Sequence, residues 1–312
     1  MFPSFTTLPL PPASLIALAP LNAIAARTAL TGTSSYLDCL VLAPGLHTQQ
    51  TALRTNDGEL PATAALTTGY VFRVENQATV AFLQRVGVPG QLVSLTVARP
   101  GSAGVGRLAE LLFGAAFCLT VAAVLGLAAV GDWCALACIA ALVAARAVNV
   151  TVVKRQSKLG WKGAPEPGVR GDLIVLVSQD RWIRITGLVD DIKTVTSGQW
   201  MRNPTDIEGF AVSAATVLVY GTAAVMGAAS PTGSAVILAL LLVEATLLGL
   251  SNSVAQRCVM FGRAISTVGK PKPYHRRTDL VRELVEETGR DDWAIGLGMM
   301  VPKAGEARGV VL

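Results

Sequence analysis

LLFGAAFCLTVAAVLGLAAV, Leu111–Val130, is the stretch that decides the fold, because it runs for twenty residues without a charged side chain. A helix that crosses a hydrocarbon core of about 30 Å needs about 20 consecutive apolar residues. This stretch therefore predicts a membrane span. Three more blocks of similar length and composition occur in the chain, and the four predicted spans are residues 108–130, 133–153, 209–227 and 233–252.

The composition agrees with membrane insertion. Hydrophobic residues make up 52% of the 312 residues and charged residues only 15%, whereas a soluble domain has about 45–50% apolar and about 25% charged residues. A soluble protein with four buried helices is the alternative, and uninterrupted apolar runs of this length argue against it. In lipid each span must satisfy its own backbone hydrogen bonds, which favours helices.

Short connections join the predicted spans in pairs. Only Gly131 and Asp132 separate the first two, and a turn around Pro231 separates the last two. The predicted fold class is therefore an α-helical integral membrane protein with four transmembrane helices arranged as two antiparallel hairpins, residues 108–153 and 209–252. A small cytosolic α+β insert, residues 154–208, lies between them.

The placement of lysine and arginine predicts the orientation. Six of the 26 basic residues precede the first span, nine lie between the second and third, ten follow the fourth, and the two short turns hold none. Basic loops stay on the cytosolic side, so we expect both termini and the insert to face the cytosol. The net charge of +5 is then a signal of topology in the lipid bilayer, and no nucleic-acid partner is predicted.

The segments outside the spans carry weaker patterns. Residues 1–107 are expected to form an N-terminal cytosolic segment that is partly disordered or surface-lying. In the insert, residues 173–177 and 182–185 predict a β-hairpin, and residues 188–198 a short amphipathic helix. In the cytosolic tail, residues 253–312, an amphipathic helix is predicted at 279–288. Its apolar stripe is expected to pack on the insert, to lie on the membrane surface or to bind a partner.

Two ionisable side chains interrupt the spans. Glu244 lies in LLLVEATLLGL, Leu240–Leu250, about 17 Å from the outer turn, and Arg146 lies about 20 Å from the same side of the second span, at 1.5 Å per residue. A lone charge at this depth is costly, so we predict an Arg146–Glu244 ion pair. The pair either fixes the packing of the helices or serves a transport route. A third alternative is that Arg146 extends to the inner interface, which would leave Glu244 protonated.

A second candidate contact lies in KPKPYHRR, residues 270–277. Four basic residues of this cluster are candidates for binding anionic lipid headgroups: Lys270, Lys272, Arg276 and Arg277. A plain topology signal also explains the cluster without any lipid specificity, and it is the favoured interpretation.

No catalytic, cofactor or metal site is predicted, and the chain is expected not to be an enzyme. Cys134 and Cys138 share one helix face, but His47 and His275, the two histidines, are far away in sequence. The pair Asp190-Asp191 lacks a third ligand in register. No nucleophile motif of the hydrolase, zinc-protease or kinase type occurs.

SQDRWIRITGLVDDIKTVTSGQW, Ser178–Trp200, and VARPGSAGVGR, Val97–Arg107, resemble sequences in a group of uncharacterised fungal integral membrane proteins. The resemblance covers residues 90–260. It implies a multi-span membrane protein and supplies neither an activity nor a site residue.

The sequence thus predicts a non-enzymatic membrane scaffold or assembly subunit, whose insert and C-terminal helix contact protein partners. The alternative is a small transporter or channel component that uses Glu244 and Arg146.

Overall fold

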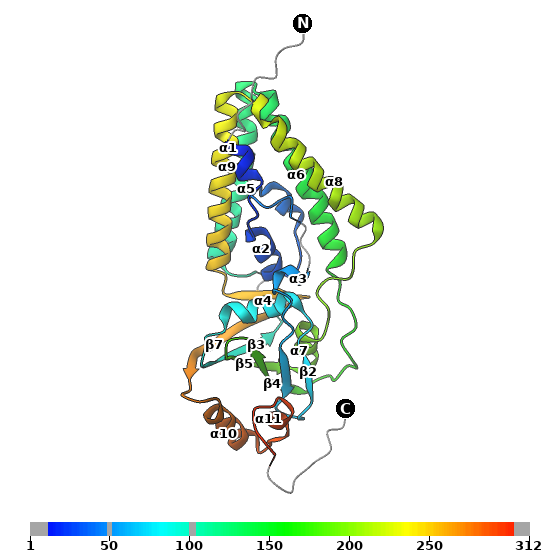
Figure 1. Cartoon of the computed structure of the whole chain (residues 1–312), viewed down its shortest axis with the longest axis vertical. Helices are drawn as coiled ribbons and strands as arrows, with labels where there is room; N and C mark the ends of the chain where they lie inside the picture. Colours follow the sequence, from blue (N-terminus) through cyan, green and yellow to red (C-terminus); the bar gives the residue numbers. More distant parts are fainter. Residues whose placement is uncertain (1–11, 49–51, 100–103, 303–312) are drawn as a thin grey trace. The chain divides into compact units, whose positions relative to one another are not determined.

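The computed structural model describes residues 12–48, 52–99 and 104–302, and the chain divides into two compact units (Figure 1). The helical unit contains residues 12–48, 104–158 and 201–255. The sheet unit contains residues 52–99, 159–200 and 256–302. The expected N-terminal segment, residues 1–107, is therefore not one region, because its two halves belong to different units.

Within the described residues, four helices are long and apolar enough to cross a membrane. They are α5 (Arg107–Val130), α6 (Trp133–Gln156), α8 (Asp206–Val225), which continues into the 3-10 turn η2 (Met226–Ala228), and α9 (Pro231–Ser253). These bounds confirm the four predicted helices. Each begins or ends at a residue suited to that place, as in the capping box of Thr205 and Glu208 at the start of α8.

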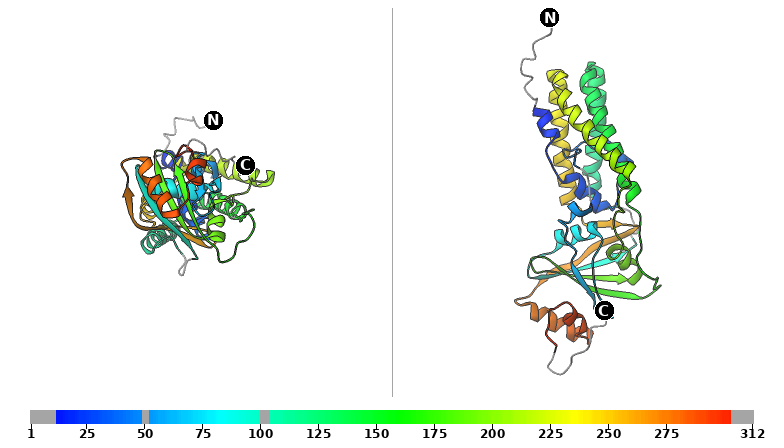
Figure 2. Two further views of the ribbon diagram at one scale, coloured as in Figure 1. Left: turned by 90° about the horizontal axis from the view of Figure 1, so that it is seen from below. Right: turned by 45° about the vertical axis from the view of Figure 1, so that its right-hand side comes forward.

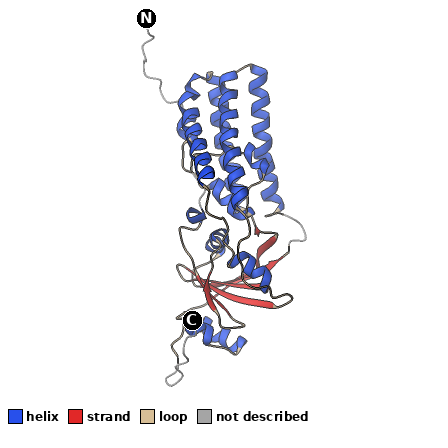
Figure 3. Ribbon diagram, turned by 90° about the vertical axis from the view of Figure 1, so that its right-hand side faces the viewer, coloured by secondary structure: helices blue, strands red, loops and turns tan. Residues whose placement is uncertain are grey.

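The four helices stand side by side (Figure 3), but the closest packing is not within the predicted hairpins. Helix α5 packs mainly along α9, and α6 packs mainly along α8. The connecting turns do meet: the Ser230 hydroxyl donates a hydrogen bond of 2.5 Å to Asp132 Oδ2. Consecutive helices are thus joined at their turns and separated along their length.

The space between the helix pairs is filled by the inner segment, as we call residues 12–48. It contains α1 (Pro12–Ala17), α2 (Ala23–Thr31) and the 3-10 helix η1 (Tyr36–Leu40), and then continues without regular structure. Leu42 and Ala43 are fully buried, in one core cluster with side chains of the long helices. The expectation that this region is disordered or surface-lying is wrong for residues 12–48, because its apolar side chains complete the core of the helical unit.

The sheet unit contains one described seven-stranded sheet, in the order β2-β1-β4-β5-β3-β7-β6. Its strands are β1 (Ala62–Ala65), β2 (Val71–Arg73), β3 (Gln91–Ala98), β4 (Arg170–Val177), β5 (Arg181–Leu188), β6 (Arg257–Met260) and β7 (Arg263–Pro273). Only β3 and β5 pair in parallel. The predicted hairpin is confirmed as β4–β5, which forms the middle of the sheet rather than a separate insert.

Helices cover both faces of this sheet (Figure 2, right). Helices α4 (Gln77–Val86) and α7 (Val189–Thr196) lie on one face, and α10 (Arg277–Thr288) and α11 (Asp292–Gly296) on the other. The short helix α3 (Ala52–Thr55) precedes β1. The apolar stripe of α10, with Leu280 and Leu284, packs against Ile174 and Trp182 of the hairpin. The two predicted amphipathic helices are therefore present, and the tail helix packs on the insert.

Candidate functional site

Glu244 is completely buried in α9, and both of its carboxyl oxygens have partners. Oε2 accepts a hydrogen bond from the backbone N–H of Leu42 in the inner segment. Oε1 is bonded to the hydroxyl of Thr120 in α5. The residue that interrupts the apolar run therefore binds the irregular backbone that lies beside it.

The hydroxyl of Thr120 also lies 2.5 Å from the carbonyl oxygen of Leu40. A threonine hydroxyl has one hydrogen and can donate to only one of these two oxygens. Both contacts are satisfied together when Glu244 carries a proton, because its carboxyl group then donates to Thr120 Oγ1 while Thr120 donates to Leu40. A neutral carboxyl group also avoids the large cost of burying an unpaired charge.

Arg146 does not pair with Glu244, so the predicted ion pair is wrong for the described residues. Its side chain is 5% exposed, and its Nε donates to the carbonyl oxygen of Asp38 at 3.3 Å. The Asp38 carboxylate accepts the backbone N–H of Ser35 at 2.8 Å. Equal depth in two helices does not bring side chains together when their helices face different neighbours, and here the inner segment lies between them.

Three more polar side chains of the long helices bind backbone carbonyl oxygens of the inner segment. Asn149 of α6 donates to Leu46 at 3.2 Å, Thr216 of α8 to His47 at 3.2 Å, and Asn252 of α9 to Ala23 at 2.7 Å. Buried backbone outside regular secondary structure needs hydrogen-bond partners from other groups of the protein. Polar side chains of the four helices thus form hydrogen bonds to the backbone of the inner segment.

Arg27 joins α2 to two of the long helices. Its guanidinium lies 3.2 Å from Oε2 of Glu110 and 4.7 Å from the centre of the Phe113 ring, both in α5. It also donates to the hydroxyl of Ser251 in α9 at 3.4 Å. Arg27 is the basic residue of the largely apolar stretch 14–30. It therefore links several elements of the helical unit.

The four candidate lipid contacts lie in the sheet unit, and two of them have partners within the protein. Lys272 of β7 lies 2.6 Å from Glu283 Oε1, and this hydrogen bond raises the pKa of Lys272. Arg277 of α10 forms an ion pair with Asp180. Lys270 lies in β7 and Arg276 directly precedes α10. Binding of these four residues to lipid stays a prediction.

No group of three or more His, Cys, Asp or Glu side chains that could hold a metal ion occurs in the part of the chain that the structure describes. The Asp190-Asp191 pair divides between two contacts: Asp191 pairs with Arg263, and Asp190 accepts the backbone N–H of Glu166 at 2.9 Å. Cys138 is buried and Cys134 exposed on α6.

Sequence reasoning missed Thr120, Asn149, Thr216 and Asn252 as a group. Two features of the sequence carried the signal. Polar residues are scattered through the predicted spans, and residues 40–46 form an apolar run that is too short to span a membrane. Comparison with protein-family models, with curated proteins and with solved structures finds no match to this chain. The resemblance to fungal membrane proteins stays a prediction.

Proposed function

We propose that this protein is an integral membrane protein whose α5, α6, α8 and α9 cross the bilayer, with both termini and the sheet unit in the cytosol, and that it acts as a non-enzymatic scaffold or assembly subunit. The distribution of lysine and arginine supports this orientation. The sheet unit, built from three separate stretches of chain, is then the part that meets cytosolic protein partners.

The observation that carries the scaffold proposal is the state of Glu244. Its side chain is 0% exposed, and both carboxyl oxygens bind protein groups. Carboxylates on ion or proton routes face a bundle interior or a water-filled cavity and exchange their partners during transport. A carboxyl group that holds Leu42 and Thr120 in place serves the packing of the helical unit instead.

A small transporter or channel component is the second candidate, and it rests on the burial of both Arg146 and Glu244 inside long apolar helices. Flux through proteoliposomes separates the two functions. The scaffold proposal expects no ion or proton flux above empty liposomes from the wild-type protein. Flux that Glu244→Gln abolishes, while Thr246→Val on the lipid-facing side of the same helix leaves it intact, would favour the transporter.

Accessibility tests the orientation independently of function. Cys134 is exposed and lies one residue into α6, next to the turn that the proposal places outside the cytosol. In sealed membrane vesicles with their cytosolic face outward, a membrane-impermeant maleimide is expected to label Cys134 only after detergent opens the vesicles, in a chain whose other cysteines are replaced by alanine. Labelling of Cys134 in the sealed vesicles would contradict the proposed topology.

A further inference from the structure

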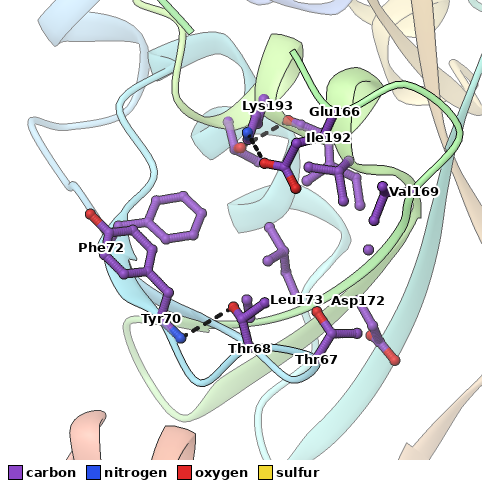
Figure 4. Close-up of a pocket in the computed structure, with 14 residues that line it drawn as sticks. Thr67, Thr68, Tyr70, Phe72, Glu166, Val169, Asp172, Leu173, Ile192 and Lys193 are labelled. Carbon is purple, nitrogen blue, oxygen red and sulfur yellow. Dashed lines mark hydrogen bonds and ion pairs between the residues drawn. The ribbon is translucent and has the colours of Figure 1, made fainter. Parts of the chain in front are cut away.

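The sheet unit contains a pocket of about 360 Å³ (Figure 4). The pocket lies on the face of the sheet that α7 covers, beside the edge strand β2. Small-molecule sites in proteins typically have volumes of about 300–1,000 Å³, with mainly apolar walls and a few polar groups. This pocket has the size of such a site, so its lining defines what it can hold.

One wall is aromatic. Tyr70 and Phe72 alternate along the chain and therefore point to the same face of the sheet. Their rings stack with centres 5.8 Å apart and planes 22° apart, and Tyr70 is 69% exposed. Aliphatic side chains also line the pocket, with Leu173 of β4 and Val189 and Ile192 of α7. Nearly parallel aromatic rings together with aliphatic side chains favour a flat apolar molecule.

The charged groups at the pocket already have partners within the protein. Lys193 pairs with Glu166 and also donates to the carbonyl oxygen of Ala164 at 3.0 Å. Asp172 lies 2.5 Å from the guanidinium of Arg184. A charged ligand would have to compete with these ion pairs or lie unpaired among them. The lining therefore favours an uncharged ligand.

Two threonine hydroxyl groups remain for a ligand. Thr67 makes no hydrogen bond to the described residues, and Thr68 accepts a bond of 3.4 Å from the backbone N–H of Tyr70 and keeps its own hydrogen. Figure 4 places both side chains on the same wall of the pocket. A hydroxyl group can donate to or accept from a ligand oxygen. They suit a ligand that carries a hydroxyl or carbonyl group.

We propose that this pocket binds an uncharged, planar aromatic molecule that carries a hydroxyl or carbonyl group. The ring lies against Phe72 and Tyr70, and the oxygen reaches Thr67 or Thr68. The proposal does not rest on the scaffold function proposed above, because it is argued only from the residues that line the pocket.

A probe series on the full chain in lipid nanodiscs tests the proposal, with empty nanodiscs as the background. The probe is 2-naphthol, which is planar, neutral and hydroxylated. We compare it with 2-naphthoate, which adds a charge, and with 2-decalol, which has the same carbon skeleton but is not planar. We expect saturable binding of 2-naphthol by fluorescence and calorimetry. Binding of 2-decalol should be about tenfold weaker, a ratio that corresponds to the loss of one good aromatic contact. Binding of 2-naphthoate should also be weaker, because its charge would lie without a partner in the pocket.

Variants locate the site. Phe72→Ala is expected to weaken 2-naphthol binding by about tenfold through the lost ring contact. Thr67→Val combined with Thr68→Val is expected to weaken 2-naphthol but not naphthalene, which has no hydroxyl. Thr278→Val, an exposed position on α10, is the matched control and should change neither.

Three results would overturn the proposal. They are the absence of saturable 2-naphthol binding in the wild-type protein, equal binding of 2-naphthoate or 2-decalol, and binding that Phe72→Ala and the double threonine variant both leave unchanged. The comparison of ligands on the wild-type chain keeps the test decisive even where a variant fails to fold.

Discussion

Replacing Glu244 separates the role of its ionisable carboxyl group from the role of its hydrogen bonds. Glutamine has the shape of glutamate, and its amide oxygen can accept the Leu42 N–H while its amide NH₂ donates to Thr120 Oγ1. Leucine fills a similar volume but leaves the Leu42 N–H without an acceptor. Thr120 keeps the carbonyl oxygen of Leu40 as its partner in that variant, so one orphaned group accounts for the change.

The magnitudes follow from that single group. A buried donor left without a partner costs about 1–3 kcal/mol, so Glu244→Leu should lower the free energy of unfolding by that amount. Glu244→Gln should lie within about 0.5 kcal/mol of the wild type, because both hydrogen bonds survive. Thr246→Val on the same helix is the control, since the Thr246 side chain is exposed and bonds only to its own helix at 2.9 Å.

The assay is unfolding of the purified protein in mixed micelles by titration with a denaturing detergent, followed by far-UV circular dichroism. A double-mutant cycle adds the decisive comparison. Glu244→Leu and Thr120→Val share a contact and should couple by about 0.5–3 kcal/mol, whereas Glu244→Gln and Arg146→Gln share no partner and should add within about 0.5 kcal/mol. Strong coupling between Arg146 and Glu244, or equal losses for Gln and Leu at position 244, would refute the hydrogen-bond assignment.

Three further predictions concern other parts of the chain. Gly233→Ala should lower the thermal midpoint of unfolding by several degrees, because a Cβ there would lie 2.0 Å from Asp132 Oδ2 and 2.7 Å from Ala135 Cβ. Gly249→Ala in the same helix meets open space and should leave the midpoint unchanged. Equal midpoints for the two variants would contradict the contact between the turns. Burial raises the pKa of the Cys258 thiol to about 12, so iodoacetamide at pH 8 should modify Cys134 and spare Cys258 until the protein unfolds, as peptide mass spectrometry can check. The hydrogen bonds from Arg184 lower the pKa of Glu287 from its ordinary 4.5. The stabilisation by this ion pair is therefore present above pH 4.5 and is lost as the pH falls through the folded-state pKa. Glu287→Gln should flatten the dependence of the free energy of unfolding on pH in that acidic range, and an unchanged profile would show that the pair does not contribute.

The sequence was sufficient for the elements whose signal is local. Twenty apolar residues in a row predict α5 without knowledge of any other part of the chain, and the β-prone runs around a polar turn predict the hairpin β4–β5. The remaining strands depend on distant partners. Strand β2 has three residues, and β3 pairs with β5 and β7, which follow it by many tens of residues. No local pattern specifies such pairings.

The inner segment shows a second limit. Residues 40–46 are apolar, but the run is far shorter than a span and contains Pro44 and Gly45, so neither helical nor strand periodicity develops. Depth along a helix could be predicted for Arg146 and Glu244, because 1.5 Å per residue fixes it. The direction in which each side chain points around its helix could not, because that depends on which element packs there. The observed partners, Asp38 and Leu42, lie in the region that the sequence predicts to be partly disordered or surface-lying.

The inner segment also explains how the helical unit is held together. In the bilayer location that we propose, helices would gain little from burying apolar surface against one another, so packing and hydrogen bonds between elements would supply the stability. Thr120 and Glu244, from the pair α5 and α9, bind residues 40 and 42. Asn149 and Thr216, from the pair α6 and α8, bind residues 46 and 47. One short stretch of backbone therefore bonds to all four helices, and each polar side chain that would be costly in a bare span becomes favourable because the stretch is there.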